Sequence, residues 1–291
     1  SVPSYPAVEA AVRALARVVE YAVWLRTPDG RPPDAESVDL AAAQSIIGRA
    51  LSASPDGVDL GADDLQQLLA AYGIDLWPAR PVTTLKEAQK VGRELGWNVI
   101  LKATADHLRE RPDQAHVVRG IDSPSEMRDA WDDLAAVIDD PAAASFVVQK
   151  LAPPGVPISI RSLEDPLFGP VVSFGISGPV IELLADVSYR IPPLYQHDAA
   201  SMVREIRSSP MLFGYRGSEV VDVDEVERLI QRVAQLQNDL PQVRSLELSL
   251  VLAGAQGASV LTASARVEPV ADPRSDWFVR RMPDLPGDTI P

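Results

Sequence analysis

Lys102 is the residue whose position most directly suggests chemistry. It ends a short, mainly apolar run that begins at Trp97, and a polar loop separates it from a second apolar run that ends at Ile121. This pattern predicts two strands joined by a loop, with an ammonium group at the end of the first strand. An ammonium group placed there can neutralise an oxygen of a nucleotide phosphate. A solvated lysine at a strand end is the alternative interpretation.

Other groups that commonly take part in catalysis are scarce. The chain contains no Cys, which excludes a disulfide framework, a cysteine zinc site and a thiol nucleophile. Its three histidines are His107, His116 and His197, so a histidine-based relay has few candidates. A chain without cysteine fits a reducing compartment, and we expect a cytoplasmic protein.

The chain is acidic, with 291 residues, a formal net charge of −14 and a pI of about 4.6. No long run of Lys or Arg is present, which disfavours nucleic-acid and membrane-surface partners. No apolar run reaches the roughly 18 residues of a transmembrane helix. The N-terminal segment is amphipathic and charged, unlike a signal peptide. Because it begins directly in a helix-like pattern, we expect the chain to be part of a longer protein.

Apolar periodicity and turn residues predict an α/β protein. A Pro-rich linker is expected at 27–36, and Pro153-Pro154-Gly155 predicts a hinge between two subdomains. Ser123 and Glu126 form a capping-box pattern at the start of one helix. Helices are predicted near residues 7–26, 38–51, 62–72, 85–95, 123–138, 198–208 and 223–240, and strands near 98–102, 116–121, 146–151, 158–163, 171–175, 243–252 and 259–267.

Six short motifs, taken in order, resemble the ATP-grasp domain of ADP-forming (NDP-forming) acyl-CoA synthetases, the acetate–CoA ligase β-subunit-like family. The resemblance covers roughly residues 62–268 and rests on the order of the motifs. They are LLAAYGI (68–74), VILKATADHLRERPD (99–113), VVQKLAPPGV (147–156), DPLFGPVVSFG (165–175), RIPPL (190–194) and GYRG (214–217).

The resemblance implies an ATP-grasp fold with two α/β subdomains built on mixed sheets and preceded by helices. It divides the chain into N-terminal helices from an upstream ligase domain (1–61), a lid subdomain (62–150), a second subdomain (151–270) and a flexible tail (271–291). It also implies ATP or ADP with Mg²⁺ as cofactors. The implied partners are an upstream CoA-binding or ligase domain and, as in some members, a GNAT acetyltransferase domain. The nucleotide-binding residues that it implies are Lys102, Arg111, Gln149, Gly175 and Gly178.

The lid loop departs from the pattern of the resembled family, in which a histidine carries the phosphoryl group. Glu110 stands at the position of that histidine, and a carboxylate that is anionic at neutral pH repels an incoming phosphoryl group. Ala115 and His116 replace a pair of glycines that allow the backbone to approach phosphates. Arg111 keeps its positive charge. His107, three residues before Glu110, is a weak substitute for the lost histidine.

Two further segments also depart from the family. Pro157 stands where the family has a glutamate that helps to hold the nucleoside, and it lacks an N–H group. The turn from Gly175 to Gly178 has one glycine fewer than the family turn but can still bend tightly. Asp186 keeps an acidic residue of the family, whereas Val187 replaces the arginine beside it.

The predicted metal site is weakened in the same way. The family has Asp and Asn two residues apart on a late strand, where both can ligate Mg²⁺, and this chain has Glu247 and Ser249. Thr262 stands where the family has an Asp in its last strand. Glu247 has a longer side chain and Ser249 is a weaker ligand. These changes cast doubt on the binding of Mg²⁺ and of ATP or ADP.

Two functions therefore compete. One is an active ADP-forming acid–CoA ligase, supported by the motif order and Lys102. The other is a degenerate ATP-grasp domain that acts as a binding, regulatory or scaffold module, and the lost lid and metal residues favour it. No catalytic residue is predicted. Arg190, Arg216 and Arg266 are candidate anion-binding residues, although structural ion pairs explain such arginines slightly better.

Overall fold

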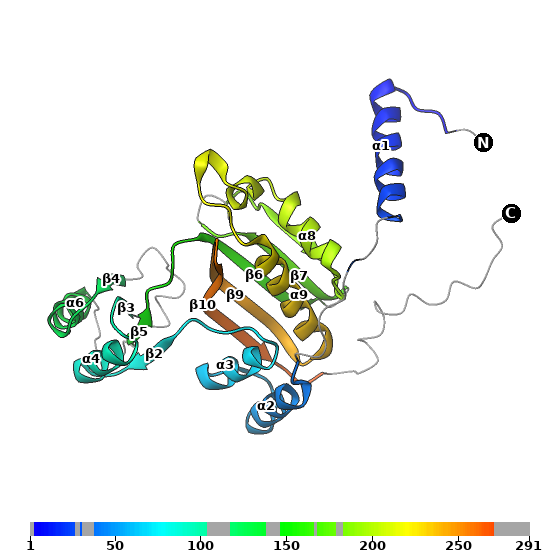
Figure 1. Ribbon diagram of the computed structural model, residues 1–291. Coiled ribbons are helices and arrows are strands. Elements are labelled where there is room, and N and C mark those ends of the chain that lie inside the picture. Colours follow the sequence, from blue (N-terminus) through cyan, green and yellow to red (C-terminus); the bar gives the residue numbers. More distant parts are fainter. Residues whose placement is uncertain are drawn as a thin grey trace.

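Two antiparallel sheets, each with helices packed against it, make up the body of the protein (Figure 1). The computed structural model describes residues 3–26, 30, 38–103, 117–137, 146–165, 168–178 and 183–270. Within these residues all the strand pairs of both sheets are antiparallel, so the sheets are more uniform than the mixed sheets expected from the sequence.

The larger sheet has six strands and the smaller sheet has four. In order across the larger sheet they are β1 (Val58–Asp59), β10 (Gly257–Val267), β9 (Val243–Gly254), β6 (Val156–Asp165), β7 (Gly169–Ile176) and β8 (Val187–Arg190). Across the smaller sheet they are β2 (Ala79–Val82), β5 (Phe146–Lys150), β3 (Val99–Ala103) and β4 (Val117–Ile121).

The helices follow the periodicity of the sequence closely, and each predicted helix is present. The very short β1 and β8 were not predicted, because strands of two and four residues are too short to show an alternating pattern. The helices are α1 (Val8–Trp24), α2 (Leu40–Ala53), α3 (Ala62–Ala70), α4 (Leu85–Glu94), α6 (Pro124–Val137), α8 (Gln196–Glu205) and α9 (Val223–Asp239), with short 3₁₀ turns η3 (Ser209–Leu212) and η4 (Tyr215–Gly217).

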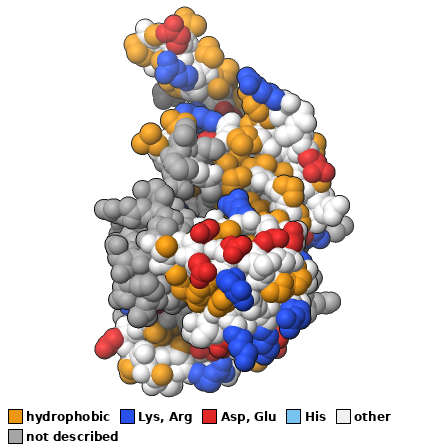
Figure 2. All heavy atoms as spheres, turned by 90° about the vertical axis from the view of Figure 1, so that its left-hand side faces the viewer, with side chains coloured by type: hydrophobic (Ala, Val, Ile, Leu, Met, Phe, Trp, Pro, Cys, Tyr) orange, Lys and Arg blue, Asp and Glu red, His pale blue; other side chains and the backbone are white. Residues whose placement is uncertain are grey.

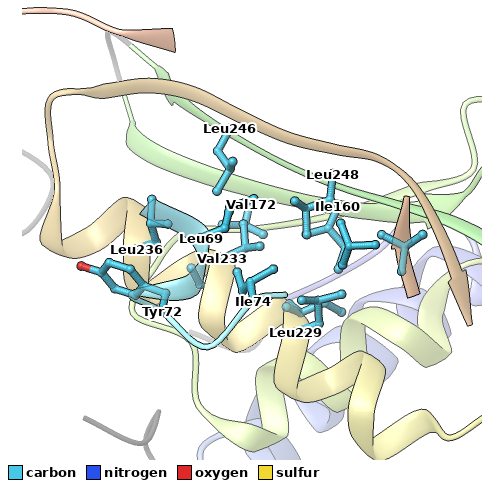
Figure 3. Close-up of a cluster of buried hydrophobic side chains, with 14 of the residues drawn as sticks. Leu69, Tyr72, Ile74, Ile160, Val172, Leu229, Val233, Leu236, Leu246 and Leu248 are labelled. Atoms are coloured by element: carbon cyan, nitrogen blue, oxygen red, sulfur yellow. The ribbon is translucent and has the colours of Figure 1, made fainter. Parts of the chain in front are cut away.

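The core of the larger sheet is formed with helices that come before and after the smaller sheet in the sequence (Figure 3). Leu69 and Ile74 come from α3 and the segment after it, and they pack with Leu236 of α9 and Leu246 of β9. Residues of α2 belong to the same core. The boundary that the sequence suggested at residue 61 therefore does not separate two cores, because amphipathic α2 and α3 bury their apolar sides on the larger sheet.

Tyr72 adds a hydrogen bond to this core. Its side chain is fully buried, and its hydroxyl donates a hydrogen bond to Asp239 Oδ2 over 3.3 Å. Burial raises the pKa of the Tyr72 hydroxyl, and the charge of Asp239 raises it further. The hydroxyl therefore stays protonated and acts as a donor that links the chain after α3 to the end of α9.

The described helices that pack on the larger sheet lie on one of its faces. On β6, Ile158 and Ile160 are buried in the helix-side core, whereas Arg161 and Leu163 are exposed. Successive residues of a strand point to opposite faces, so the exposed residues mark the face away from the helices. This open face holds Glu247, one of the two residues that the sequence predicted to bind a metal.

The smaller sheet packs against α4 and α6, and local capping fixes both helices. The Thr84 hydroxyl accepts a hydrogen bond from the Glu87 amide (3.2 Å), and Glu87 Oε2 accepts one from the Thr83 amide (2.8 Å). At the other end of α4, Gly96 has φ +74° and its amide bonds to the Arg93 carbonyl, as in a Schellman cap. A side chain at Gly96 would be strained in this conformation.

The predicted start of α6 is confirmed. The Ser123 hydroxyl accepts a hydrogen bond from the Glu126 amide over 3.3 Å, and the Glu126 carboxylate accepts one from the Asp122 amide over 2.7 Å. The carboxylate thus reaches one residue further back than in the usual capping box. This arrangement fixes the start of α6, the helix that packs on the core face of β3.

Trp77 joins the two units near the hinge. Its amide donates to the Val260 carbonyl of β10 (2.8 Å), and its indole Nε1 donates to the Lys150 carbonyl of β5 (2.9 Å). One residue thus bonds to a strand of each sheet. These bonds hold the start of the smaller unit against the larger sheet.

Helix α1 stands apart from the body (Figure 1), and its apolar side chains are exposed. Val8, Val12, Leu15 and Val19, which share one helix face, are each more than half exposed. None of the helices in the described ranges combines the length and the apolarity needed to cross a bilayer. Seen from the side of the smaller sheet, the described part of the surface shows both basic and acidic side chains (Figure 2).

Candidate functional site

Lys102 is held by the alternation of β3. Val99, Leu101 and Ala103 are buried in the core beneath α4 and α6, so Lys102 lies on the opposite face of the smaller sheet. Its side chain is half-buried. The predicted strand and the predicted position of the ammonium group at its end are thus both present.

The charge on Lys102 is disfavoured by its surroundings. Burial lowers the pKa of Lys102 below the ordinary lysine value, and the positive charge of Arg119 on β4 lowers it further. No described carboxylate lies within ion-pair distance of Lys102 or Arg119. Two neighbouring cations without a carboxylate are suited to an anionic ligand such as a phosphate.

Gln149 lies on the same face of the smaller sheet, but it is only 1% exposed. Its Nε2 donates to the Leu261 carbonyl of β10 over 3.0 Å, so the side chain ties the two units together. Its Oε1 is buried without a hydrogen-bond partner. Gln149 was predicted to bind the nucleotide, and in this structure its visible role is to connect the two sheets.

Glu247, the better of the two predicted metal ligands, is engaged by an arginine. It lies on the open face of the larger sheet, directly opposite Arg161 of β6, and its Oε1 lies 2.8 Å from Arg161 Nε. An arginine cannot be displaced by deprotonation at neutral pH, so it competes with a metal ion for this carboxylate. The pair is partly exposed and contributes little to stability.

Ser249 lies where β9 is irregular. Ile158 pairs with Val251 and Ile160 pairs with Leu248, so β9 holds one residue more than β6 in this stretch. Such a bulge changes the direction of side chains and is not visible in an alternating sequence pattern. Among the described residues no group of three or more His, Asp or Glu side chains is placed to hold a metal ion.

The two predicted glycines differ in their surroundings. Gly175 is buried between β6 and β8, and a Cβ atom there would lie 3.1 Å from the Asp186 carbonyl oxygen. Close strand packing therefore explains the absence of a side chain at this position. Gly178 has φ +142° and no atom within 4 Å of a Cβ position, so space is open around it. Neither observation tests a role in nucleotide binding.

The three candidate anion-binding arginines all have internal partners. Arg190 forms two hydrogen bonds to the carboxylate of Glu205, at 2.8 and 2.6 Å. Arg266 pairs with Glu268 at 2.7 Å and with Asp59 at 3.6 Å. Arg216, at φ +54°, lies over the Tyr215 ring with 5.4 Å between its guanidinium carbon and the ring centroid. The structural interpretation of these arginines fits better than anion binding.

A cavity of about 580 Å³ opens beside β8, lined in part by Asp186, Val187 and Ser208. Asp186 accepts hydrogen bonds from the Arg207 amide and from the Ser208 amide and hydroxyl. Burial raises the pKa of Asp186, but these bonds outweigh it and leave that pKa below its ordinary value. Asp186 thus fastens the end of α8 to β8, which is a structural role.

The lid residues lie outside the described part of the chain. These are His107, Glu110, Arg111, Asp113, Ala115 and His116. What was predicted for them stays a prediction. Residues that the sequence did not single out are Arg119 and Arg161. The spacing of Val117 and Arg119 on a predicted strand could have placed Arg119 on the face of Lys102, whereas the Arg161–Glu247 pairing needs the sheet order.

The sequence of most of the chain matches one family. A family model described as ATP-grasp domain matches residues 53–267, which include both sheets. The chain belongs to the ATP-grasp family. This confirms the predicted fold of two α/β units and the family that the motifs indicated.

Two relatives of this ATP-grasp domain are ADP-forming acetate–CoA ligases. The acetate–CoA ligase [ADP-forming] II subunit beta of Pyrococcus furiosus is 29% identical over 209 residues, covering 70% of this chain and 89% of the relative. The acetate–CoA ligase [ADP-forming] I of Archaeoglobus fulgidus is 30% identical over 229 residues, covering 77% of this chain and 33% of the relative. This region thus occurs both as a subunit and within a longer chain.

A solved structure confirms the fold. It is the dinucleotide-forming acetyl-coenzyme A synthetase 1 of Ca. Korarchaeum cryptofilum in complex with coenzyme A and Mg-AMPPCP. It is 30% identical to this ATP-grasp domain with a TM-score of 0.64, covering 78% of this chain and 100% of that one. Its phosphohistidine segment points towards the nucleotide-binding site. An adenine nucleotide with Mg²⁺ is therefore a ligand of that relative.

Proposed function

We propose that this ATP-grasp domain is the nucleotide-binding unit of an acyl-CoA synthetase-like protein that has lost transfer of a phosphoryl group through a lid histidine. It acts instead as a binding, regulatory or scaffold module. The observation that carries the proposal is the 2.8 Å contact between Glu247 and Arg161, which occupies the remaining acidic side chain at the predicted metal position.

The loss at the metal position is chemical as well as geometric. In phosphoryl transfer a magnesium ion bridges phosphate oxygens and offsets the charge that develops on them. A carboxylate bound to a guanidinium, together with a serine, offers a poor ligand set for this ion. The residues that could bind phosphate are better retained, since Lys102 stays on its strand without a described carboxylate partner.

The sequence of the lid supports the same conclusion. Glu110 stands where the phosphohistidine is expected, and a carboxylate there repels the group that the histidine accepts. The alternative function, an active ADP-forming acid–CoA ligase domain that couples acyl-CoA cleavage to ATP synthesis, draws on Lys102 and on 29–30% identity to such ligases. It leaves the changes at Glu110, Glu247 and Ser249 unexplained.

The test is the dependence of ATP binding on Mg²⁺. We expect titration calorimetry with ATP to show no tighter binding in Mg²⁺ than in EDTA, because no ion bridges protein and phosphates. Tightening by about tenfold or more in Mg²⁺ would show a working metal site and contradict the proposal.

A restored variant makes this test sharper. Arg161→Leu combined with Glu247→Asp and Ser249→Asn removes the competing guanidinium and returns the family pair of ligands. This variant is expected to gain Mg²⁺ dependence that the parent lacks. The matched control is Arg244→Leu. It removes an exposed arginine of the same sheet that pairs with Glu268 and not with Glu247.

We further propose that α1 packs against an upstream CoA-binding or ligase domain of the same protein. Support comes from its exposed apolar face and from relatives in which this region is a subunit or part of a longer chain. A GNAT acetyltransferase domain and a cytoplasmic location stay expectations drawn from the sequence. Val12→Asp with Leu15→Asp should weaken co-purification of the two parts when they are expressed separately, and unchanged co-purification would count against this packing.

A further inference from the structure

Arg119 lies beside Lys102 because of the register of two strands. Lys102 pairs with Val117, and Val118 packs into the core under α6, so Val117 and Arg119 point to the opposite face. The register shifts by one residue between the Val99–Ile121 and Leu101–Val118 pairs, where Gly120 has φ +71°, and Arg119, which precedes this bulge, is the diagonal neighbour of Lys102. Diagonal neighbours in an antiparallel pair have their Cα atoms about 7–8 Å apart, which lets two long side chains reach one ligand.

The proximity of these two cations is unfavourable for the stability of the sheet without a ligand. Like charges on neighbouring strands destabilise a sheet, and burial adds a cost for the Lys102 ammonium. The neighbours on this face include Ile100, Val117 and Val147, which bring no compensating charge. An anion with two or more charges would offset the repulsion between the two cations.

The larger sheet adds no unpaired carboxylate at the predicted metal position Glu247. In an ordinary metal-dependent site, carboxylates hold the metal ion and would repel polyphosphate without it. Here the carboxylate of Glu247 is already neutralised by Arg161, which is partly exposed on the open face. At Glu247 the positive charge beside the carboxylate is that of an arginine.

We infer that Lys102 and Arg119 form a binding site for the polyphosphate of a nucleotide that needs no divalent metal ion, with Arg119 supplying charge that Mg²⁺ supplies elsewhere. This inference deepens the proposed function and rests on it. It assigns a binding residue, Arg119, and a ligand form, metal-free nucleoside di- or triphosphate.

The test is binding of ATP and of inorganic triphosphate in EDTA, measured by calorimetry at low ionic strength. Wild-type protein should bind both, and AMP should bind at least about tenfold more weakly because it lacks the charges that the two cations share. Arg119→Gln and Lys102→Gln should each weaken binding by about tenfold or more, the loss expected for one charge-assisted contact.

Arg80→Gln is the matched control. Arg80 is an exposed arginine on β2, at the other edge of the same sheet, and the substitution removes the same charge. It should change the affinity by less than about twofold. Melting curves verify that each variant is folded, and Arg119→Gln is expected to melt no lower than wild type because it removes a repulsion.

The outcomes separate this inference from the proposed function. Equal binding by Arg119→Gln and wild type in EDTA would overturn the anion site alone. Binding that appears only with Mg²⁺ would overturn both the anion site and the proposed loss of metal-dependent chemistry.

Discussion

Burial and the positive charge of Arg119 both disfavour the charged form of Lys102. The same residue on a free strand end would cost nothing to ionise, so its position is a liability for stability that a ligand can relieve. Gln149 shows a second such liability, since its buried Oε1 has no partner. Glu247 shows the reverse, because an arginine satisfies it. The polar residues at this site therefore differ in whether a hydrogen-bond or ion-pair partner satisfies them.

Replacement of Lys102 by Met should raise the melting temperature by a few degrees at neutral pH. The pKa of Lys102 is lower in the folded chain than in the unfolded chain, so the charged form is penalised below the folded-state pKa. Stability rises as the pH climbs from that value towards 10.5, the ordinary lysine value. The advantage of the Met variant should therefore shrink above neutral pH. A variant that melts lower than wild type at pH 7 would contradict this.

Substitutions at Gln149 should distinguish the stabilising hydrogen bond of its Nε2 from the cost of its unpaired Oε1. Gln149→Leu loses one hydrogen bond, worth about 1 kcal/mol, but also removes an unpaired buried carbonyl that costs about 1–3 kcal/mol. We expect urea denaturation to give a free energy of unfolding equal to wild type or slightly higher. A loss of more than about 2 kcal/mol would mean that Oε1 has a partner.

Gln149→Glu provides the contrasting variant. A buried carboxylate beside the Leu261 carbonyl has its pKa raised, so its neutral form suits the fold. Stability should be lost as the pH rises from about 4 to 7, whereas wild type should change less over this range. Equal pH dependence of the two proteins would argue against burial of this side chain.

The elements around the site are fixed by their own ends rather than by the site. Helix α4 is capped by Thr84 and closed at Gly96, and α6 begins at Ser123. These local signals are why the helices beside β3 could be predicted from sequence. The bulge in β9 had no such signal, because only the pairing with β6 reveals it.

Thr84→Ala should lower the free energy of unfolding by about 1 kcal/mol, because the Glu87 amide loses its acceptor. The measurement is urea denaturation followed by circular dichroism. Lys86→Ala, an exposed change in the same turn, is the control and should stay within about 0.5 kcal/mol of wild type. Equal effects of the two changes would show that the cap does not hold α4.

At the scale of the whole molecule, two cores meet at a narrow junction. Trp77 and Gln149 bond across it, whereas α2 and α3 belong to the larger core. The order of elements, the hinge and the position of Lys102 could be predicted, because periodicity and turn residues are local. The packing of α2 and α3 on the larger sheet and the partners of Glu247 and Gln149 could not, because residues far apart in sequence create those contacts.

The most direct measurement of the central claim is transfer of labelled phosphate from ATP to the chain. The protein is incubated with Mg²⁺ and ATP labelled at its γ-phosphate, and acid-labile phosphate on the protein is counted. We predict no label above that of a heat-denatured sample, because Glu110 replaces the accepting histidine and Glu247 is bound to Arg161. Acid-labile label approaching one phosphate per chain would contradict the account.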